Sequence, residues 1–148
     1  MMIRGFEKIN EKAIMPVRAT KGSAGYDFFL VERLVLAPGE ANVIKTYLKA
    51  YMKDDEFLSI HIRSSVSINK GLQLVNQMGI VDSDYYNNPD NEGHIMIFVR
   101  NTSDRVVIIE AGERIAQGIF MKYLLADGDN VNSRRRGGFG STNKGEND

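Results

Sequence analysis

The chain carries the sequence NQMGIVDSDY at residues 76–85, shortly after the pair Gly71-Leu72. The stretch combines an amide, a glycine that permits close approach of the backbone, two carboxylates and an aromatic ring. We expect these groups along one hairpin, where they would suit a base, a sugar and an attacking water. Taken singly, the residues also fit structural roles, with Asn76 as a turn residue and Gly79 as a bulge.

Short apolar runs lie between turn signals over most of the chain, which is typical of a sandwich or barrel of short strands. The expected strands are Tyr26–Val35, Asn42–Tyr51, Phe57–Arg63, Ile95–Arg100, Val106–Ile109 and Ile115–Tyr123. Turn sequences at 37–40 (Ala-Pro-Gly-Glu) and 110–113 (Glu-Ala-Gly-Glu) agree with this pattern. The one helical candidate is Ser65–Lys70, because no long period of 3.6 residues occurs. The sequence therefore predicts an all-β protein.

Size and charge narrow the class further. The 148 residues suffice for one domain, and the absence of cysteine excludes disulfides, thiolate metal sites and a cysteine nucleophile. The 19 basic residues balance the 19 acidic ones, so no overall field favours nucleic acid or an anionic membrane. Charges near Met1 and the lack of a long apolar window argue against a signal peptide or membrane span. We expect a cytoplasmic protein.

The chain changes character at about Ala126, where Gly, Asn, Asp and Ser become frequent. We therefore divide it into a β domain, residues 1–125, and a flexible arm, residues 126–148. The arm contains three consecutive arginines, 134–136, and the sequence GGFGST at 137–142. Glycines beside a lone aromatic, Phe139, would let the backbone wrap a ligand while the ring stacks on it.

Phosphate binding needs donors, and the chain lacks the Gly-rich Lys-Ser/Thr loop of P-loop enzymes. Arg63, Ser64 and Ser65 offer a guanidinium and two hydroxyls at the end of an expected strand. Alone, this tripeptide equally fits ordinary helix capping.

Five segments in a fixed order resemble the trimeric family of dUTPases, which hydrolyse dUTP to dUMP and pyrophosphate. They are SAGYD at 23–27, RSS at 63–65, NQMGIVDSDY at 76–85, GERIAQ at 112–117 and GGFGST at 137–142. The resemblance extends from about Pro16 to Thr142. It implies a jelly-roll β-sandwich that forms a homotrimer with three shared active sites.

The resemblance implies roles for the residues of 76–85. Asn76, Gly79, Ile80 and Val81 would read uracil and leave no room for a thymine methyl. Tyr85 would pack against the deoxyribose and exclude a 2′-hydroxyl. Asp82 would be the general base that activates water for attack on the α-phosphorus. The residues alone left Asp82 and Asp84 equally placed for that role.

The remaining implied roles concern the triphosphate and the arm. Phosphate contacts are expected from Arg63, Ser64, Ser65 and Gln117, and Asp27 would touch Mg2+ through a water. Arg134 would hold the γ-phosphate, while Phe139, with Gly140 and Ser141, would cap the uracil. His61 and His94 are expected to be structural or surface residues.

Two departures from the family pattern are visible. Arg135 stands where the family often has Gly, so the choice of phosphate clamp among Arg134, Arg135 and Arg136 stays open, with Arg134 favoured. After Tyr85 the chain inserts residues 86–92, YNNPDNE, before Gly93. We interpret this insertion as a surface loop, and a role at the mouth of the site or in binding a partner is the alternative.

The function implied is Mg2+-assisted hydrolysis of dUTP, which limits uracil incorporation into DNA and supplies dUMP for dTMP synthesis. A dCTP deaminase, which shares the fold and an Arg-Ser-Ser segment, is a rival enzyme, although Asp82 and the GGFGST segment point away from it. A rival of another class is a nucleotide-gated binding protein that signals through its arm or through 86–92 to a regulatory partner. A purely structural jelly roll would leave the five segments unexplained.

Overall fold

The computed structural model describes residues 1–133, 135, 137 and 138. In that part the chain is mostly β-strand with little helix. The elements in order are β1 (Gly5–Lys8), β2 (Tyr26–Phe29), β3 (Leu34–Leu36), β4 (Ala41–Lys45), β5 (Leu48–Tyr51), β6 (Glu56–Ile62), α1 (Ser64–Lys70), β7 (Leu72–Leu74), β8 (Gly79–Asp82), the 3-10 turn η1 (Ser83–Tyr85), β9 (Met96–Asn101), β10 (Val107–Ile109) and β11 (Arg114–Lys122). No helix among them has the length and hydropathy needed to cross a bilayer.

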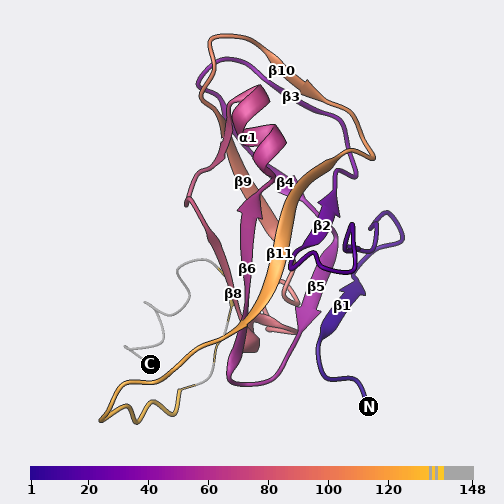
Figure 1. The fold of residues 1–148 in the computed structure, drawn as a ribbon. Helices are drawn as coiled ribbons and strands as arrows, with labels where there is room; N and C mark the ends of the chain where they lie inside the picture. The colour runs from indigo at the N-terminus through magenta and orange to yellow at the C-terminus, as the bar shows by residue number, and fades with distance from the viewer. Residues whose placement is uncertain (134, 136, 139–148) are drawn as a thin grey trace.

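The strands form four antiparallel groups, of which two carry most of the core (Figure 1). The larger sheet has the order β2-β11-β6-β8, and a second sheet has the order β4-β9-β7. The pairs β1-β5 and β3-β10 complete the fold, and Figure 1 shows β3 and β10 beyond α1 at the upper end. Buried side chains of both larger sheets, among them Phe28, Leu58, Ile97 and Val99, join one hydrophobic core.

The predicted strands are confirmed in place, with two corrections. The run Tyr26–Val35 is divided into β2 and β3, and Asn42–Tyr51 is divided into β4 and β5. The second break covers residues 46 and 47. Tyr47 has a left-handed φ of 56°, which an extended strand does not allow. The predicted helix is confirmed with one additional residue at its start, Ser64.

Both predicted turns are present and join strands. Glu40 donates its N–H to the Ala37 carbonyl at 3.0 Å between β3 and β4, and Glu113 donates to Glu110 at 3.2 Å between β10 and β11. Gly112 has a φ of +89°, which explains why that turn requires glycine.

The expected hairpin at residues 76–85 is wrong in its pairing. β7 pairs with β9, and β8 pairs with β6, so the two strands on either side of the turn belong to different sheets. Before the turn, Val75 donates its N–H to the carbonyl of Phe98 in β9. After the turn, Gly79 of β8 is paired with Ile60 of β6. The segment therefore connects the two sheets at one edge of the core.

We expect Gly118→Ala to destabilise the fold by about 1–3 kcal/mol, because overpacking a filled core forces its side chains to move. A Cβ there would lie 2.8 Å from a ring carbon of Phe28 and 3.1 Å from a methyl of Leu58, both fully buried. Urea unfolding at one fixed protein concentration measures the loss. Gly22→Ala is the control, because a Cβ there meets nothing within 4 Å. Equal midpoints for the two variants would contradict this account of the core.

Candidate functional site

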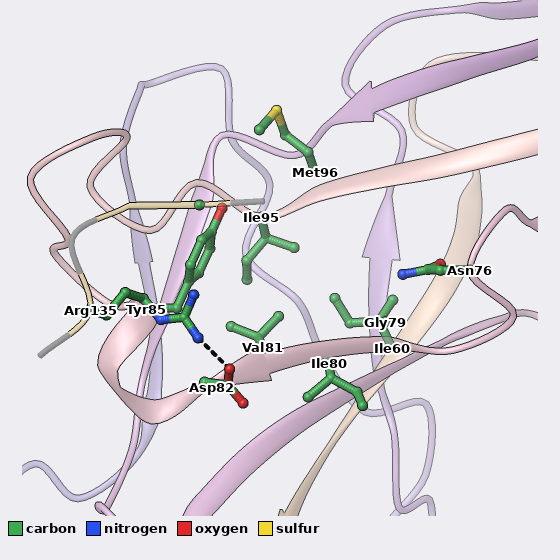
Figure 2. Close-up of a pocket in the computed structure, with 11 residues that line it drawn as sticks. Ile60, Asn76, Gly79, Ile80, Val81, Asp82, Tyr85, Ile95, Met96 and Arg135 are labelled. Carbon is green, nitrogen blue, oxygen red and sulfur yellow. Dashed lines mark hydrogen bonds and ion pairs between the residues drawn. The ribbon is translucent and has the colours of Figure 1, made fainter. Parts of the chain in front are cut away.

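A cavity of about 260 Å³ opens beside β8 (Figure 2). Six of the residues predicted for the site line it together, namely Asn76, Gly79, Ile80, Val81, Asp82 and Tyr85. In Figure 2, Asn76 lies on the side of the cavity opposite Tyr85 and Arg135, and Asp82 lies below the space between them. The cavity thus gathers the groups expected for a base, a sugar and a water.

The backbone of β8 lies close to a side chain of β6 at Gly79. A Cβ at this position would lie 3.0 Å from the Cβ of Ile60, its cross-strand partner. The predicted need for a glycine at this point therefore has a physical cause, which is the narrow wall between cavity and core.

Two carboxylates stand at the end of β8, and one guanidinium bridges them. Arg135 donates from Nε to Asp84 at 2.8 Å and from a terminal nitrogen to Asp82. Its side chain is only 14% exposed, although both carboxylates are about half exposed. Asp82 lines the cavity, and Asp84 is not among its lining residues. This distinction separates two residues that sequence reasoning could not.

Tyr85 is buried in the cavity wall and held at its hydroxyl. The hydroxyl donates to the His94 carbonyl at 2.6 Å and accepts from Asn91 Nδ2 at 2.9 Å. Burial raises the pKa of Tyr85 above its usual value, which keeps the phenol protonated and able to donate. Arg135 also stacks over the ring, with its guanidinium carbon 5.9 Å from the ring centre.

The predicted phosphate segment lies at the end of β6 and the start of α1. Arg63 is the residue before the helix, and its N–H donates to the Ile115 carbonyl of β11 at 3.0 Å. No side chain caps α1, and Ser64 and Ser65 are exposed. The capping role that the sequence left open is therefore absent.

Asp27 and Gln117 face each other on β2 and β11, with His61 of β6 next in register. Their neighbours Phe28, Gly118 and Ile60 point to the core, so strand alternation places Gln117 and His61 on the other face of the sheet. The cavity is lined from both faces at β8, by Val81 on the core side and by Ile80 and Asp82 on the side of His61, but β6 lies between β8 and β11. The structure thus divides the predicted residues: of those it describes, Asp27, Arg63, Ser64, Ser65 and Gln117 do not line this cavity.

Within the described residues, no group of three His, Cys, Asp or Glu side chains could hold a metal ion. Asp27 supplies one carboxylate, whose side chain is 10% exposed and pairs with Arg114 at 3.6 Å. A single hard oxygen donor fits Mg2+ only where substrate phosphates and water provide the other ligands.

Four predicted residues, Arg134, Phe139, Gly140 and Ser141, lie outside the described part of the chain, as does Arg136. Gly138 of the same segment lines the cavity beside Arg135.

Sequence reasoning missed several residues of the wall, among them Ile95 and Met96. Both lie at the start of the predicted strand Ile95–Arg100, but no pattern distinguished them from core residues. The sequence also assigned no role to Asn91, which donates to the hydroxyl of Tyr85, although Asn91 lies in the insertion 86–92 that departs from the family pattern.

Comparison with known proteins agrees with the segments from which the site was predicted. The family model described as dUTPase matches residues 11–146. The deoxyuridine 5′-triphosphate nucleotidohydrolase of Lactococcus lactis is 51% identical, over 96% of this chain and 99% of its own.

Solved structures agree as well. A dUTPase from Streptococcus mutans has a TM-score of 0.78 at 46% identity and covers 84% of this chain and 99% of its own. A Staphylococcus bacteriophage 80alpha dUTPase with dUpNHpp has a TM-score of 0.74 at 26% identity, covering 95% and 98%.

The fold and the match thus define a nucleotidohydrolase of β architecture, and the chain belongs to the dUTPase family. It is accordingly an enzyme, a dUTP diphosphatase, as the five segments predicted. The dCTP deaminase rival is thereby rejected.

We expect His94 to make stability depend on pH. Its Nε2 accepts the Tyr47 N–H at 3.0 Å, and burial, followed by the charge of Lys45, lowers the pKa of His94. The unfolded chain then takes up a proton first, near its usual pKa of about 6.5. This stabilisation is complete above that pH and is lost as pH falls through the lower folded pKa.

Urea midpoints between pH 7.5 and 5 measure the effect. His94→Gln keeps a neutral acceptor but does not titrate, so its midpoints should fall less steeply below pH 6.5 than those of the wild type. Parallel curves for the two proteins would contradict a role for His94.

Proposed function

We propose that the reaction is in-line attack by water on the α-phosphorus of dUTP, with Asp82 as general base and pyrophosphate as leaving group. The observation that carries this assignment is the place of Asp82 at the end of β8, lining the cavity within the same wall as Tyr85. Its side chain is 52% exposed, so a water molecule has access to the carboxylate. Asp84 does not line the cavity, which favours Asp82 for the base.

Uracil would be bound by Asn76 and by the backbone of β8 from Gly79 to Val81. In the described sheet β8 is an edge strand, paired with β6 on one side only. Its other edge therefore leaves backbone donors and acceptors for a planar base. Cytosine would place an amino donor where uracil accepts, and the resulting unpaired polar groups reject it strongly. The buried ring of Tyr85 would pack on the deoxyribose and exclude a 2′-hydroxyl.

The triphosphate would be held by Arg63, Ser64, Ser65 and Gln117. In one chain Gln117 lies on β11, which β6 separates from β8, and it does not line the cavity. Among the described residues, the two halves of the predicted set therefore do not line one cavity, and a second copy would supply the phosphate half. This division supports a jelly-roll homotrimer with shared active sites, because a closed ring lets each chain give one part to a neighbour.

The divalent ion would be Mg2+, held by phosphate oxygens and, through a water, by Asp27. When bound, it would neutralise charge that develops on the phosphates. The residues of this chain would align the substrate, since Arg63 and the two serines fix the phosphates while Asp82 orients the water and accepts its proton.

The arm, residues 126–148, would act as a lid over the β domain, residues 1–125. Arg135 and Gly138 at the cavity support this role. Arg134 would hold the γ-phosphate, and Phe139, with Gly140 and Ser141, would cap the uracil and exclude water. The cytoplasmic location stays a prediction, as does the biological role of limiting uracil in DNA and supplying dUMP for dTMP synthesis.

We expect Asp82→Asn to lower the rate of pyrophosphate release from dUTP by about 100- to 10,000-fold, because the amide cannot accept the proton. Pyrophosphate release from dUTP is measured in the presence of Mg2+, and release from dCTP, dTTP and UTP is measured in parallel for comparison. The matched control is Asp84→Asn. It removes one negative charge from the same turn, at a residue that contacts the same arginine, Arg135. A large loss in Asp84→Asn with Asp82→Asn active would overturn the choice of base. Tight dUTP binding without release by the wild type would favour the nucleotide-gated binding protein.

We expect Arg134→Ala to weaken dUTP handling far more than dUMP binding, because its proposed contact is the γ-phosphate. Arg135→Ala and Arg136→Ala are the matched variants, as each removes one charge from the same run. Equal losses of dUTP and dUMP affinity in Arg134→Ala would refute the clamp, and a triphosphate-selective loss in Arg135→Ala would move the clamp to Arg135.

A further inference from the structure

The insertion at residues 86–92, here called the 86–92 loop, folds around Tyr85. Asn88 is 5% exposed, and its Nδ2 donates to the Tyr85 carbonyl and to Asn91 Oδ1, both at 2.8 Å. Asn88 Oδ1 accepts the N–H groups of Asp90 and Asn91 at 3.0 and 3.1 Å. The loop lies on the surface, as the sequence predicted, with Asn87, Pro89, Asp90 and Glu92 exposed, and the bonds of Asn88 give it a defined structure.

Other contacts tie the same loop to the first sheet pair, β1-β5. Tyr86 donates its hydroxyl to Glu7 of β1, and Lys49 of β5 donates to Asn87 Oδ1 at 2.6 Å and to Glu92 at 3.1 Å. The ring of Tyr86 also lies under the Lys49 ammonium, 5.4 Å from its centre. The loop is therefore held from the side away from the cavity.

On its inner side, the loop reaches the hydroxyl of Tyr85 through Asn91. Asn91 Nδ2 donates to that hydroxyl at 2.9 Å, and the hydroxyl donates onward to the His94 carbonyl at 2.6 Å. Asn91 Oδ1 meanwhile accepts the Gly93 N–H at 3.0 Å, so the amide is fixed at both ends. A phenol that both donates and accepts cannot swing about its ring axis without losing a buried bond.

The loop also touches the arm. Gly138 donates its N–H to Asp90 at 3.5 Å, and a Cβ at Gly138 would come within 3.1 Å of Asn91 Nδ2. Asn91 and the ring of Tyr85 both lie next to Gly138 of the arm.

We propose that Asn91 is a positioning residue for sugar selection, which holds the ring of Tyr85 at the angle that admits a deoxyribose and rejects a 2′-hydroxyl. The inference rests on the proposed function, in which Tyr85 faces the sugar. A ring that excludes one oxygen atom must be held firmly, because a small displacement would make room for it. Asn91 supplies the constraint from an insertion that is a departure of this chain from the family pattern.

The sharpest test is Asn91→Asp. The aspartate keeps the shape of the side chain and an oxygen for Asn88 and Gly93, but it removes the donor to Tyr85 and offers the phenol a competing acceptor. The matched control is Asn87→Asp, which makes the same charge change in the same loop at the contact with Lys49.

We expect the ratio of kcat/KM for dUTP over UTP to fall at least threefold in Asn91→Asp and to stay within twofold of the wild type in Asn87→Asp. Urea midpoints for both variants report any general loosening of the loop. An unchanged ratio in a folded Asn91→Asp protein, or an equal fall in both variants, would overturn the proposal.

Equilibrium binding of dUMP and UMP separates this inference from the proposed function, because it requires no hydrolysis. If the wild type releases no pyrophosphate while Asn91→Asp narrows the dUMP-over-UMP preference at least threefold, the catalytic proposal fails and the positioning role stands. If the wild type hydrolyses dUTP and neither ratio changes in Asn91→Asp, the positioning role alone fails.

Discussion

The pairing of β8 with β6 is the constraint on which the rest of the site depends. It brings Gly79 opposite Ile60 and Asp82 opposite Phe57, so the whole strand is fixed in register against a core strand. Because β8 is at the end of its sheet, its second edge remains available to the cavity. A shift of one residue would turn Val81 out of the core and move Asp82 from the place where it lines the cavity.

The same sheet explains why a single chain brings together only part of the predicted set. In the order β2-β11-β6-β8, the strand β6 lies between Gln117 on β11 and the cavity residues of β8. In the proposed homotrimer a neighbouring copy would supply the missing residues, and symmetry would repeat the arrangement at every interface.

Local patterns predicted much of the fold, since the positions of most strands, α1 and both turns follow from apolar runs and turn residues, while the short strands β1 and β7 were not predicted. The partners of those strands do not follow from local patterns. The stretch 76–85 looked like a hairpin because two strand-like runs flank a short turn, yet β7 and β8 pair with strands distant in sequence. The sequence predicted the residues of β8 that line the cavity, because they lie together in the stretch 76–85. It could not predict Asn91, because the role of Asn91 depends on its contact with Tyr85 in the folded chain.

Electrostatics links the arm to the carboxylates at the end of β8. With 19 basic and 19 acidic residues, the chain has no overall attraction for a triphosphate, so binding must come from a few cations placed locally. In this structure Arg135 donates hydrogen bonds to Asp82 and Asp84, whose side chains are both about half exposed. Phosphate oxygens and carboxylates compete for the same guanidinium geometry. Because water reaches both carboxylates, salt and solvent screen part of their attraction for the arginine. In the proposed reaction, the triphosphate would compete with both carboxylates for Arg135, and the exchange would leave the Asp82 carboxylate free to accept a proton.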